Sequence, residues 1–361
     1  MNIQESVRER YARGAEGRVA ALCCPVSYDL RFLEPIPQEV LDRDYGCGDP
    51  SAYVREGETV LDLGSGGGKI CFIASQIVGE KGRVIGVDMT PEMLERARRN
   101  APLVAEKTGL DNVEFRRGHI EDLSTDLDLL DAHLKDHPVA SAADYEALQQ
   151  EIARLRTEQP LIADDSIDVI VSNCVLNLVA DAQKRALFDE MFRVLKVGGR
   201  IAISDIVSDK PSPPHLKQDK ELWSGCISGA LQEAEFVQAL EQAGFHGITI
   251  DKYDAAPWRV VEDISYRSVT VLAWKGKQGP CVDEGQSVIY RGPWKRVEDD
   301  DGHIIERGER VEVCAKTFRL MAQEPYAGQM IAADPAAGAA PDGDPCCAPD
   351  ASQAGPDRCC P

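Results

Sequence analysis

Cysteine is the residue type through which this sequence could do the most distinctive chemistry. The chain of 361 residues contains twelve cysteines and six histidines, and the histidines are scattered without the spacing of a metal site. Three cysteines, Cys47, Cys174 and Cys226, lie far apart in the chain, and each is in a stretch that predicts a loop beside a strand. Thiolates are soft ligands, so three of them at one place would suit a soft centre. Cys71, by contrast, lies inside an apolar helical stretch and is expected to be an ordinary buried thiol.

A glycine-rich turn is the second feature that could do chemistry. Residues 60–63 predict a short buried strand, residues 64–68 supply four glycines and one serine, and residues 70–78 predict an apolar helix. A strand, a glycine turn and a helix form the first half of a nucleotide-binding βαβ unit. Glycine lets the backbone approach a ligand where any Cβ would clash. The turn therefore predicts a site for a cofactor that contains a nucleoside.

The residues around this turn distinguish a dinucleotide from S-adenosylmethionine. A dinucleotide fingerprint requires a third glycine where Lys69 stands, and a helix N-terminus for the pyrophosphate. S-adenosylmethionine has no phosphate but needs a close backbone, an acid for its cationic end and an acid for its ribose. Asp62 and Asp88, in the first and second predicted strands, fit these two roles. We therefore expect S-adenosylmethionine, with Met89 on the adenine and Ile120 and Glu121 at its other edge. The expected binding residues are Asp62, Gly64, Ser65, Gly66, Asp88, Met89, Ile120 and Glu121.

The elements that must position these residues alternate between strands and helices. Strand patterns occur at residues 58–63, 83–88, 113–116, 167–172, 200–205, 248–250 and 268–273, and helical patterns lie between most of them. Such alternation predicts an α/β fold with a largely parallel sheet and helices on both faces. Ligands of open α/β sheets bind at the carboxyl ends of strands. Cys174 follows the fourth strand and Cys226 the fifth, so we expect both to converge with Cys47 beside the cofactor.

The remaining segments predict further parts of the molecule. Residues 1–56 predict a helical N-terminal arm, residues 57–276 the cofactor-binding domain, and residues 277–331 a small β-rich domain. Helical patterns within residues 124–164 predict an inserted hairpin of helices. Residues 332–361 are rich in Ala, Gly, Pro and Asp and are expected to be disordered. This tail carries two Cys-Cys pairs, and the sequence leaves open whether they deliver a soft ion or have no role.

The formal net charge of −21 limits the expected partners. Nucleic acids and anionic membranes both require a basic footprint, so neither is expected as the main partner. Residues 1–22 contain no apolar run ahead of a cleavage site, and no apolar stretch is long enough to cross a bilayer. We therefore expect a cytoplasmic protein that works as a monomer. In a reducing compartment its cysteines favour thiol chemistry or soft-ion binding over a disulfide framework.

Trivalent arsenic fits three converging thiolates. It takes three sulfur ligands and keeps a lone pair, and this lone pair can attack the methyl carbon of S-adenosylmethionine in line as the thioether leaves. The thiols lose their protons when the ligand binds, so no general base is needed at the transfer. The rate then depends on positioning and approach.

At these residues the sequence resembles the arsenite methyltransferase family, within the class I S-adenosylmethionine-dependent methyltransferases. The matching stretches are residues 45–48, 61–68, 118–121, 172–179 and 225–231. The resemblance covers residues 23–330 and implies a Rossmann-like sheet of seven strands, mostly parallel with the last one antiparallel. It also implies methylation of arsenite to mono- and dimethylated arsenicals.

The resemblance further implies roles for individual residues. Cys174 and Cys226 would bind arsenic, with Cys47 as a third thiol. Asn173 would contact the cofactor, and Cys23 or Cys24 would join a disulfide relay that keeps arsenic trivalent. The substrate would be arsenite or its thiol conjugates, and the partner a reductant of the thioredoxin or glutathione type.

Two other functions stay open on the sequence. A methyltransferase for selenium, tellurium or an organic acceptor would keep Asp62 and Asp88 but leave Cys47 and Cys226 dispensable. A thiol protein without enzymatic activity could instead sequester soft ions, with the tail pairs as its main site. Deleting residues 332–361 would abolish most ion binding in the second case and spare turnover in an enzyme.

Overall fold

The computed structural model describes residues 7, 10–12, 28–42 and 46–333. The described residues divide into two compact units, one from Met1–Ala243 with Ile248–Lys275 and the other from Gly244–Gly247 with Gly276–Pro361. Cys23, Cys24 and the four tail cysteines lie outside the described residues. The relay role and the tail role therefore stay predictions.

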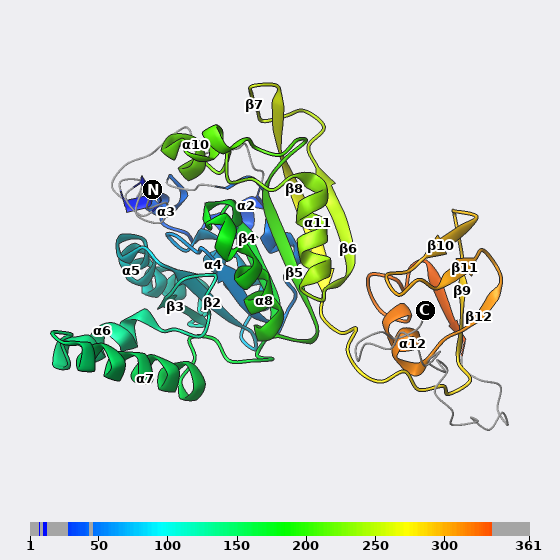
Figure 1. Cartoon of the computed structure of the whole chain (residues 1–361), viewed down its shortest axis with the longest axis horizontal. Coiled ribbons are helices and arrows are strands. Elements are labelled where there is room, and N and C mark those ends of the chain that lie inside the picture. Colours follow the sequence, from blue (N-terminus) through cyan, green and yellow to red (C-terminus); the bar gives the residue numbers. More distant parts are fainter. Residues whose placement is uncertain (1–6, 8–9, 13–27, 43–45, 334–361) are drawn as a thin grey trace. The chain divides into compact units, whose positions relative to one another are not determined.

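The first unit is built on one mixed sheet (Figure 1). Its strands are β1 Thr59–Leu63, β2 Arg83–Asp88, β3 Val113–Arg117, β4 Ile167–Asn173, β5 Leu195–Ser208, β6 His246–Tyr253, β7 Arg259–Val261 and β8 Ile264–Trp274. They stand in the order β3, β2, β1, β4, β5, β8 and β6, with β7 paired to β8. The strands from β1 to β5 pair in parallel and β8 is antiparallel to β5, which confirms the predicted α/β class.

The sheet differs from the prediction by one additional strand. The short strand β7 pairs with β8 through the two-residue turn Glu262-Asp263, so the sheet has eight strands rather than seven. Both turn residues have positive φ, 48° and 64°. Such a turn is usually marked by Asn-Gly or Asp-Gly, and the Glu-Asp pair gives no such signal.

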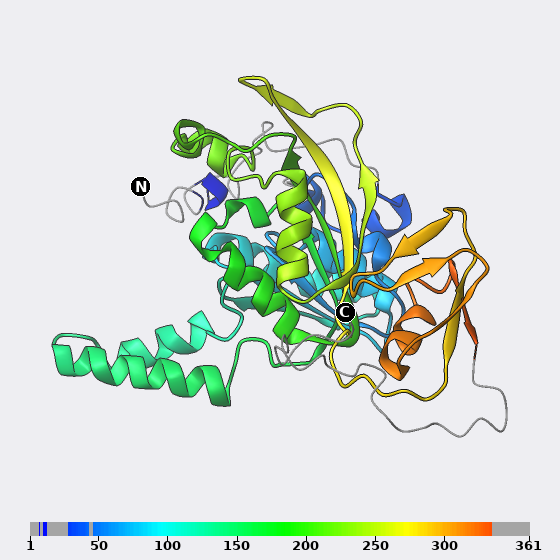
Figure 2. The same cartoon turned by 45° about the vertical axis from the view of Figure 1, so that its right-hand side comes forward.

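Four longer helices accompany the sheet. They are α4 Lys69–Val78, α5 Pro91–Thr108, α8 Lys184–Val194 and α11 Glu233–Gln242. Proline stands at the first position of α5 and Gly109 ends that helix in the left-handed region, as helix-terminus preferences predict. The helices α8 and α11 lie side by side next to β5 (Figures 1 and 2), where the rings of Phe188 and Phe236 are 6.1 Å apart.

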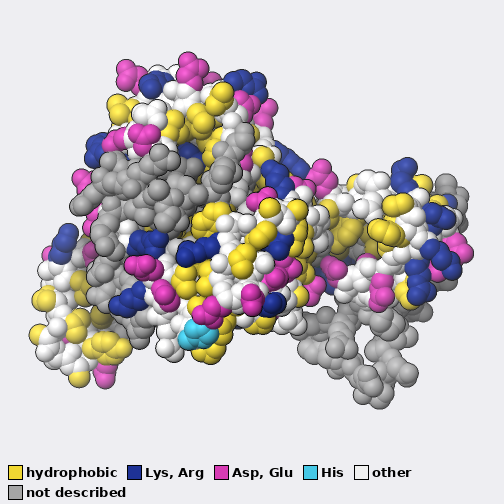
Figure 3. All heavy atoms as spheres, turned by 90° about the horizontal axis from the view of Figure 1, so that it is seen from above, with side chains coloured by type: hydrophobic (Ala, Val, Ile, Leu, Met, Phe, Trp, Pro, Cys, Tyr) yellow, Lys and Arg dark blue, Asp and Glu magenta, His cyan; other side chains and the backbone are white. Residues whose placement is uncertain are grey.

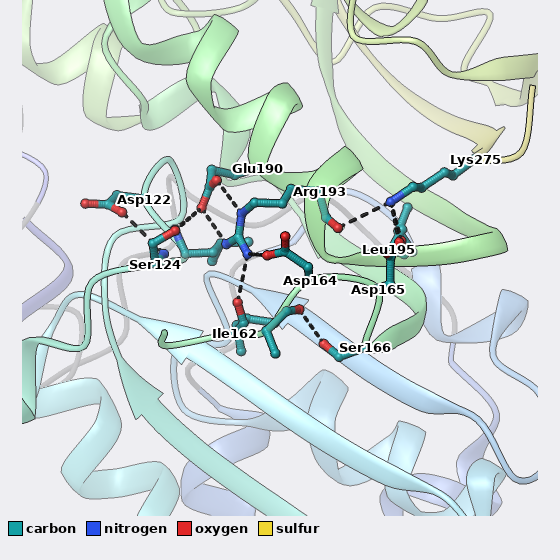
Figure 4. A network of polar contacts seen from close by, with 12 residues as sticks. Asp122, Ser124, Ile162, Asp164, Asp165, Ser166, Glu190, Arg193, Leu195 and Lys275 are labelled. Atoms are coloured by element: carbon teal, nitrogen blue, oxygen red, sulfur yellow. Dashed lines mark hydrogen bonds and ion pairs between the residues drawn. The ribbon is translucent and has the colours of Figure 1, made fainter. Parts of the chain in front are cut away.

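Two helices fill most of the segment between β3 and β4. They are α6 Leu127–Asp136 and α7 Ala142–Glu158, and Figure 2 shows them extending away from the sheet. Leu155 is the one buried residue of the two helices. The base of this hairpin is held by α8 (Figure 4): Glu190 accepts a hydrogen bond from Leu123 N, and Arg193 donates to Ile162 O and pairs with Asp164. Contacts with α8 therefore hold the two ends of the insertion close together at one place beside the sheet.

Short helices connect the larger elements of the first unit. They are α2 Leu30–Leu33, α3 Gln38–Leu41, η2 Pro50–Tyr53, η3 Leu176–Leu178, η4 Asp181–Gln183, α9 Pro214–Lys217 and α10 Lys220–Ser224. Val7 and residues 10–12 are helical as well. In α10 the Asp219 side chain accepts hydrogen bonds from the first turn, which sets the start of that helix.

The second unit is small and mostly antiparallel. The strands β9 Ser287–Tyr290, β12 Arg310–Glu312 and β13 Met330–Ala333 form one sheet, and β10 Arg296–Glu298 pairs with β11 Ile304–Glu306. The helix α12 Ala315–Met321 packs with these strands around the buried side chain of Tyr290. The sequence patterns did not indicate α12 or β13, because neither is long enough to show a clear period.

Acidic and basic side chains are interspersed on the face shown in Figure 3. Among the described residues, no helix is both long enough and apolar enough to cross a membrane.

Candidate active site

The candidate site lies where the order of strands changes direction. The strands β2 and β3 continue outward on one side of β1, and the chain then returns to place β4 on the other side. Ligands of open α/β sheets bind at the carboxyl ends of the strands at such a point. The turns that follow β1 and β4 pack so closely together that a Cβ on Gly64 would clash with the side chain of Val175.

A cavity opens at this edge of the sheet. Its lining includes all of the residues predicted to bind the cofactor: Asp62, Gly64, Ser65, Gly66, Asp88, Met89, Ile120, Glu121 and Asn173. Cys174 lies in the same lining, and so do Val7, Tyr11, Thr90 and Met93, which the sequence analysis did not name. The position of these residues is thus clear, and which of them bind the cofactor stays a prediction.

Asp88 ends β2 and is oriented by backbone donors. Gly66 N donates to one carboxylate oxygen at 2.9 Å, and Thr90 N donates to the other at 2.8 Å. Burial raises the pKa of Asp88, and these hydrogen bonds partly oppose the rise. The Thr90 side chain and the Met89 backbone also hydrogen-bond to this carboxylate, so its place at the cavity is well fixed.

Asp62 is a buried carboxyl in β1. Burial raises the pKa of Asp62 to about 7, and the charge of Asp88 adds to the rise. The Cys71 thiol, which donates to Asp62 at 3.2 Å, and the Lys69 ammonium act in the opposite direction. A cationic ligand in the cavity would favour the ionised form of this carboxyl. Cys71 is therefore buried as expected, but it also binds a site residue.

The loop that carries Cys47 is held by Asn173 at the end of β4. Cys47 N and Gly48 N donate to the Asn173 side-chain oxygen at 2.9 and 3.2 Å, and its amide nitrogen donates to Gly48 O at 2.7 Å. A Cβ on Gly46 would clash with this same amide. Asn173 lines the cavity, and its hydrogen bonds to the Cys47 loop were not foreseen from the sequence.

The predicted thiols do come together, though not as three separate thiolates. Cys47 and Cys174 form a disulfide with their Cα atoms 5.9 Å apart. Cys226 is a buried thiol whose sulfur donates to the carbonyl oxygen of Cys174 at 3.0 Å. The hydroxyl of Tyr11 lies 4.0 Å from the Cys226 sulfur. The sequence analysis expected thiol chemistry rather than a disulfide framework, and it did not predict this pairing, in which the folded loops hold two sulfurs within bonding range.

Cys174 and Cys226 share an unusual backbone conformation. Their φ angles are 57° and 59°, in the left-handed region that few residues other than glycine adopt. A side chain in this region costs about 1–2 kcal/mol. Strained residues of this kind cluster at functional sites, where the surrounding structure holds them in place.

Known proteins resemble this chain over most of its length. A family model described as a methyltransferase domain matches residues 55–163 and 140–244, and one described as a domain of unknown function matches residues 277–358. The arsenite methyltransferase of Aquipseudomonas alcaligenes is 33% identical over 344 residues, which are 90% of this chain and 89% of that protein. The chain belongs to the arsenite methyltransferase family. The arsenite methyltransferase of Homo sapiens is 32% identical over 323 residues, 85% of this chain and 76% of that protein.

A solved structure extends the likeness of this arsenite methyltransferase family member to three dimensions. The arsenic(III) S-adenosylmethionine methyltransferase from Chlamydomonas reinhardtii matches with a TM-score of 0.58 and 26% identity. The match covers 90% of this chain and 98% of that one. The chain is an S-adenosylmethionine-dependent methyltransferase, and S-adenosylmethionine is its cofactor. The open glycine turn and the two buried carboxyls of the cavity fit this cofactor, which carries cationic and ribose groups but no phosphate.

Asp205 is a residue of this methyltransferase that the sequence analysis placed only in a strand. It is buried, and a carboxylate oxygen and the sulfurs of Cys47 and Cys174 all lie within 4.8 Å of one another. The carboxylate accepts hydrogen bonds from Leu176 N at 2.9 Å and the Asn177 amide at 2.8 Å. Burial raises the pKa of Asp205 to about 6. The signal in the sequence for Asp205 as a site residue was its place at the carboxyl end of the fifth predicted strand, near the loops that carry the cysteines.

The loop of Cys226 is fixed to the loop of Cys174 by close packing. A Cβ on Gly229 would clash with Asn177 O, and Lys184 donates to Gly229 O at 2.5 Å. The Trp223 indole donates to Leu178 O at 3.2 Å. These contacts hold the third thiol beside the other two without a covalent bond.

Proposed function

We propose that this enzyme methylates the trivalent arsenic of arsenite, held by cysteine thiolates, to mono- and dimethylated arsenicals. The observation that supports this best is the place of Cys174. It lines the cavity, forms a disulfide with Cys47, and accepts a hydrogen bond from the Cys226 thiol at its carbonyl oxygen. A cysteine on the wall of a methyl-donor cavity, with two further cysteines beside it, suits a soft acceptor. S-adenosylmethionine supplies an electrophilic methyl group when it is bound.

Reduction of the Cys47–Cys174 disulfide would prepare the acceptor site. Two electrons from a thiol reductant of the thioredoxin or glutathione type yield two thiols beside Cys226. Arsenite, As(OH)3, then exchanges its three hydroxyls for three sulfurs and releases three waters, and the thiol protons leave with the hydroxyls. The arsenic atom keeps its lone pair for the methyl group.

The same pair of thiols would return arsenic to the trivalent state. Methyl transfer uses the lone pair and leaves arsenic pentavalent. Two thiolates then give it two electrons and become a disulfide, which is the form that Cys47 and Cys174 adopt here. The thiol of Cys23 or Cys24 would exchange with this disulfide, and the external reductant would then reduce the disulfide that results. We further propose that the enzyme acts as a monomer in a reducing compartment such as the cytoplasm.

A product assay tests this proposal. The reduced protein is incubated with arsenite and S-adenosylmethionine labelled in its methyl group, and arsenicals are identified by mass spectrometry. We expect labelled mono- and dimethylated arsenic from the native chain and none from Cys174→Ser, while Cys174→Ser still binds the cofactor. Cys281→Ser, a matched exchange in the second unit, should keep turnover. Labelled methyl on selenite or tellurite but not on arsenite would contradict the arsenic assignment.

A further inference from the structure

The second unit contains a pair of thiols that the proposed methyl transfer does not use. Cys281 is partly exposed, whereas Cys314, which precedes α12, is buried with 1% exposure. Their segments are joined by the backbone, because Ala315 N donates to Val282 O at 2.8 Å. Cys281 is the neighbouring thiol whose side chain acts on the Cys314 sulfur and helps to lower its pKa. Neighbouring thiols on paired segments are the arrangement that can bind one soft atom.

The surroundings of Cys314 favour its thiolate. Thr317 N donates to the Cys314 sulfur at 3.5 Å, and the Thr317 hydroxyl lies 3.3 Å from it. Burial raises the pKa of Cys314, but these contacts and the neighbouring Cys281 side chain outweigh it and lower the pKa. The thiolate is the form of cysteine that binds soft ions.

The number of ligands limits what the pair can hold. Structural zinc takes four ligands in tetrahedral geometry. The group of three possible metal ligands found among the described residues of this unit is Asp299, Asp301 and His303, and it includes neither Cys281 nor Cys314. The pair therefore offers two sulfurs. A trivalent arsenical with one As–C bond has two exchangeable positions, so two thiolates complete its coordination.

We propose that Cys281 and Cys314 form a second arsenical site, which binds singly methylated trivalent arsenic as a dithiolate. In the binding step CH3As(OH)2 meets two thiols, two As–S bonds form, two As–O bonds break, and two waters leave with the thiol protons. Arsenic stays trivalent, so the step consumes no oxidant or reductant. The proposal rests on the proposed function, because methyl transfer to arsenite supplies this arsenical.

Protection from alkylation tests the pair in the reduced full-length chain. The probe is phenylarsine oxide, which also carries one As–C bond, and iodoacetamide labelling of the peptide that contains Cys281 is the readout. We expect the probe to protect Cys281 in the native chain. In Cys314→Ser one sulfur is left, and loss of the second, intramolecular bond should weaken protection about 100-fold or more. Equal labelling with and without the probe in the native chain would overturn the proposal, as would undiminished protection in Cys314→Ser.

A second variant covers the case in which Cys314→Ser does not fold. Cys281 is partly exposed, so Cys281→Ser should keep the fold and lose one bound equivalent of phenylarsine oxide by intact mass. An unchanged number of equivalents would count against the pair. Arg319→Ala, at an exposed position of α12, keeps both sulfurs and their neighbours and is the matched control, which should still bind the probe. Assay of the same samples for methyl transfer separates the two proposals: protection without methylated arsenic contradicts the proposed function alone, and methylated arsenic without protection contradicts this site alone.

Discussion

The candidate site has two halves, which are assembled from the chain in different ways. The cofactor half comes from one continuous run, in which β1, its glycine turn, α4 and β2 bring Asp62 and Asp88 to one edge of the sheet. The thiol half comes from distant loops, since Cys47 and Cys174 are separated by 127 residues and Cys226 lies a further 52 residues along the chain. The cofactor half thus depends on local order, and the thiol half depends on how loops pack.

The halves also differ in backbone strain. Positive φ angles in the cofactor half fall on Gly64, Gly66 and Gly68, where no Cβ opposes them. In the thiol half they fall on Cys174 and Cys226, which carry side chains. The difference indicates that thiol geometry is kept at a cost in stability, whereas the cofactor turn has no such cost. A substitution in one half should therefore impair the function of that half and leave the function of the other unchanged.

The largest expected effect is loss of methyl transfer in Cys226→Ser. Serine keeps the size of the side chain and can still donate to Cys174 O, but its oxygen is a poor ligand for trivalent arsenic. We expect methyl transfer to arsenite to fall about 1000-fold, with the dissociation constant of S-adenosylmethionine changed less than twofold. Labelled-product assay and calorimetry measure the two. A variant that binds the cofactor poorly would show that the halves are not independent.

Asp88→Ala is expected to have the opposite effect to Cys226→Ser: it should weaken cofactor binding and leave arsenite binding intact. Loss of this carboxylate removes the acceptor of Gly66 N and Thr90 N and the predicted partner of the ribose. Hydrogen bonds to a charged group contribute about 1.5–3 kcal/mol, so cofactor affinity should fall about 10- to 100-fold. Arsenite binding to the reduced thiols should be unchanged.

Glu92→Ala is the matched control for that variant, because Glu92 is exposed in the first turn of α5. It should bind the cofactor as the native chain does. If Asp88→Ala and Glu92→Ala bound S-adenosylmethionine equally well, Asp88 would have no role in the cofactor half.

A smaller effect is expected from pH, again in the cofactor half. The pKa of Asp62 is about 7, so below pH 7 most of the unliganded protein carries a neutral carboxyl. A cationic cofactor favours the ionised form, and its binding must then release a proton. Affinity should therefore fall as pH falls, by about tenfold from pH 8 to pH 6. Asp62→Asn should bind more weakly with no such slope, and an equal slope in both proteins would assign the titration to another group.

The same contrast explains what the sequence could predict. The cofactor half was predictable because Asp62, the glycines and Asp88 lie in one continuous run of strand, turn, helix and strand. The convergence of the cysteines followed from strand ends together with the resemblance to the family. The disulfide between Cys47 and Cys174 and the hydrogen bonds of Asn173 to the Cys47 loop did not follow, because they depend on the register in which distant loops pack. Asp205 ends the fifth predicted strand, which was a signal, but its nearness to Cys47 and Cys174 depends on the same packing of loops.

The smallest expected effect tests the strain at Cys226 directly. Cys226→Gly and Cys226→Ala both remove the thiol, but only alanine keeps a Cβ at a φ of 59°. The glycine variant should be more stable than the alanine variant by about 1 kcal/mol. The matched pair is Cys71→Gly and Cys71→Ala in the first turn of α4, where glycine should be less stable than alanine by up to about 1 kcal/mol. Denaturant unfolding of the four variants gives both differences. Opposite signs at the two positions are the expected result, and the same sign at both would mean that the thiol half carries no backbone strain at Cys226.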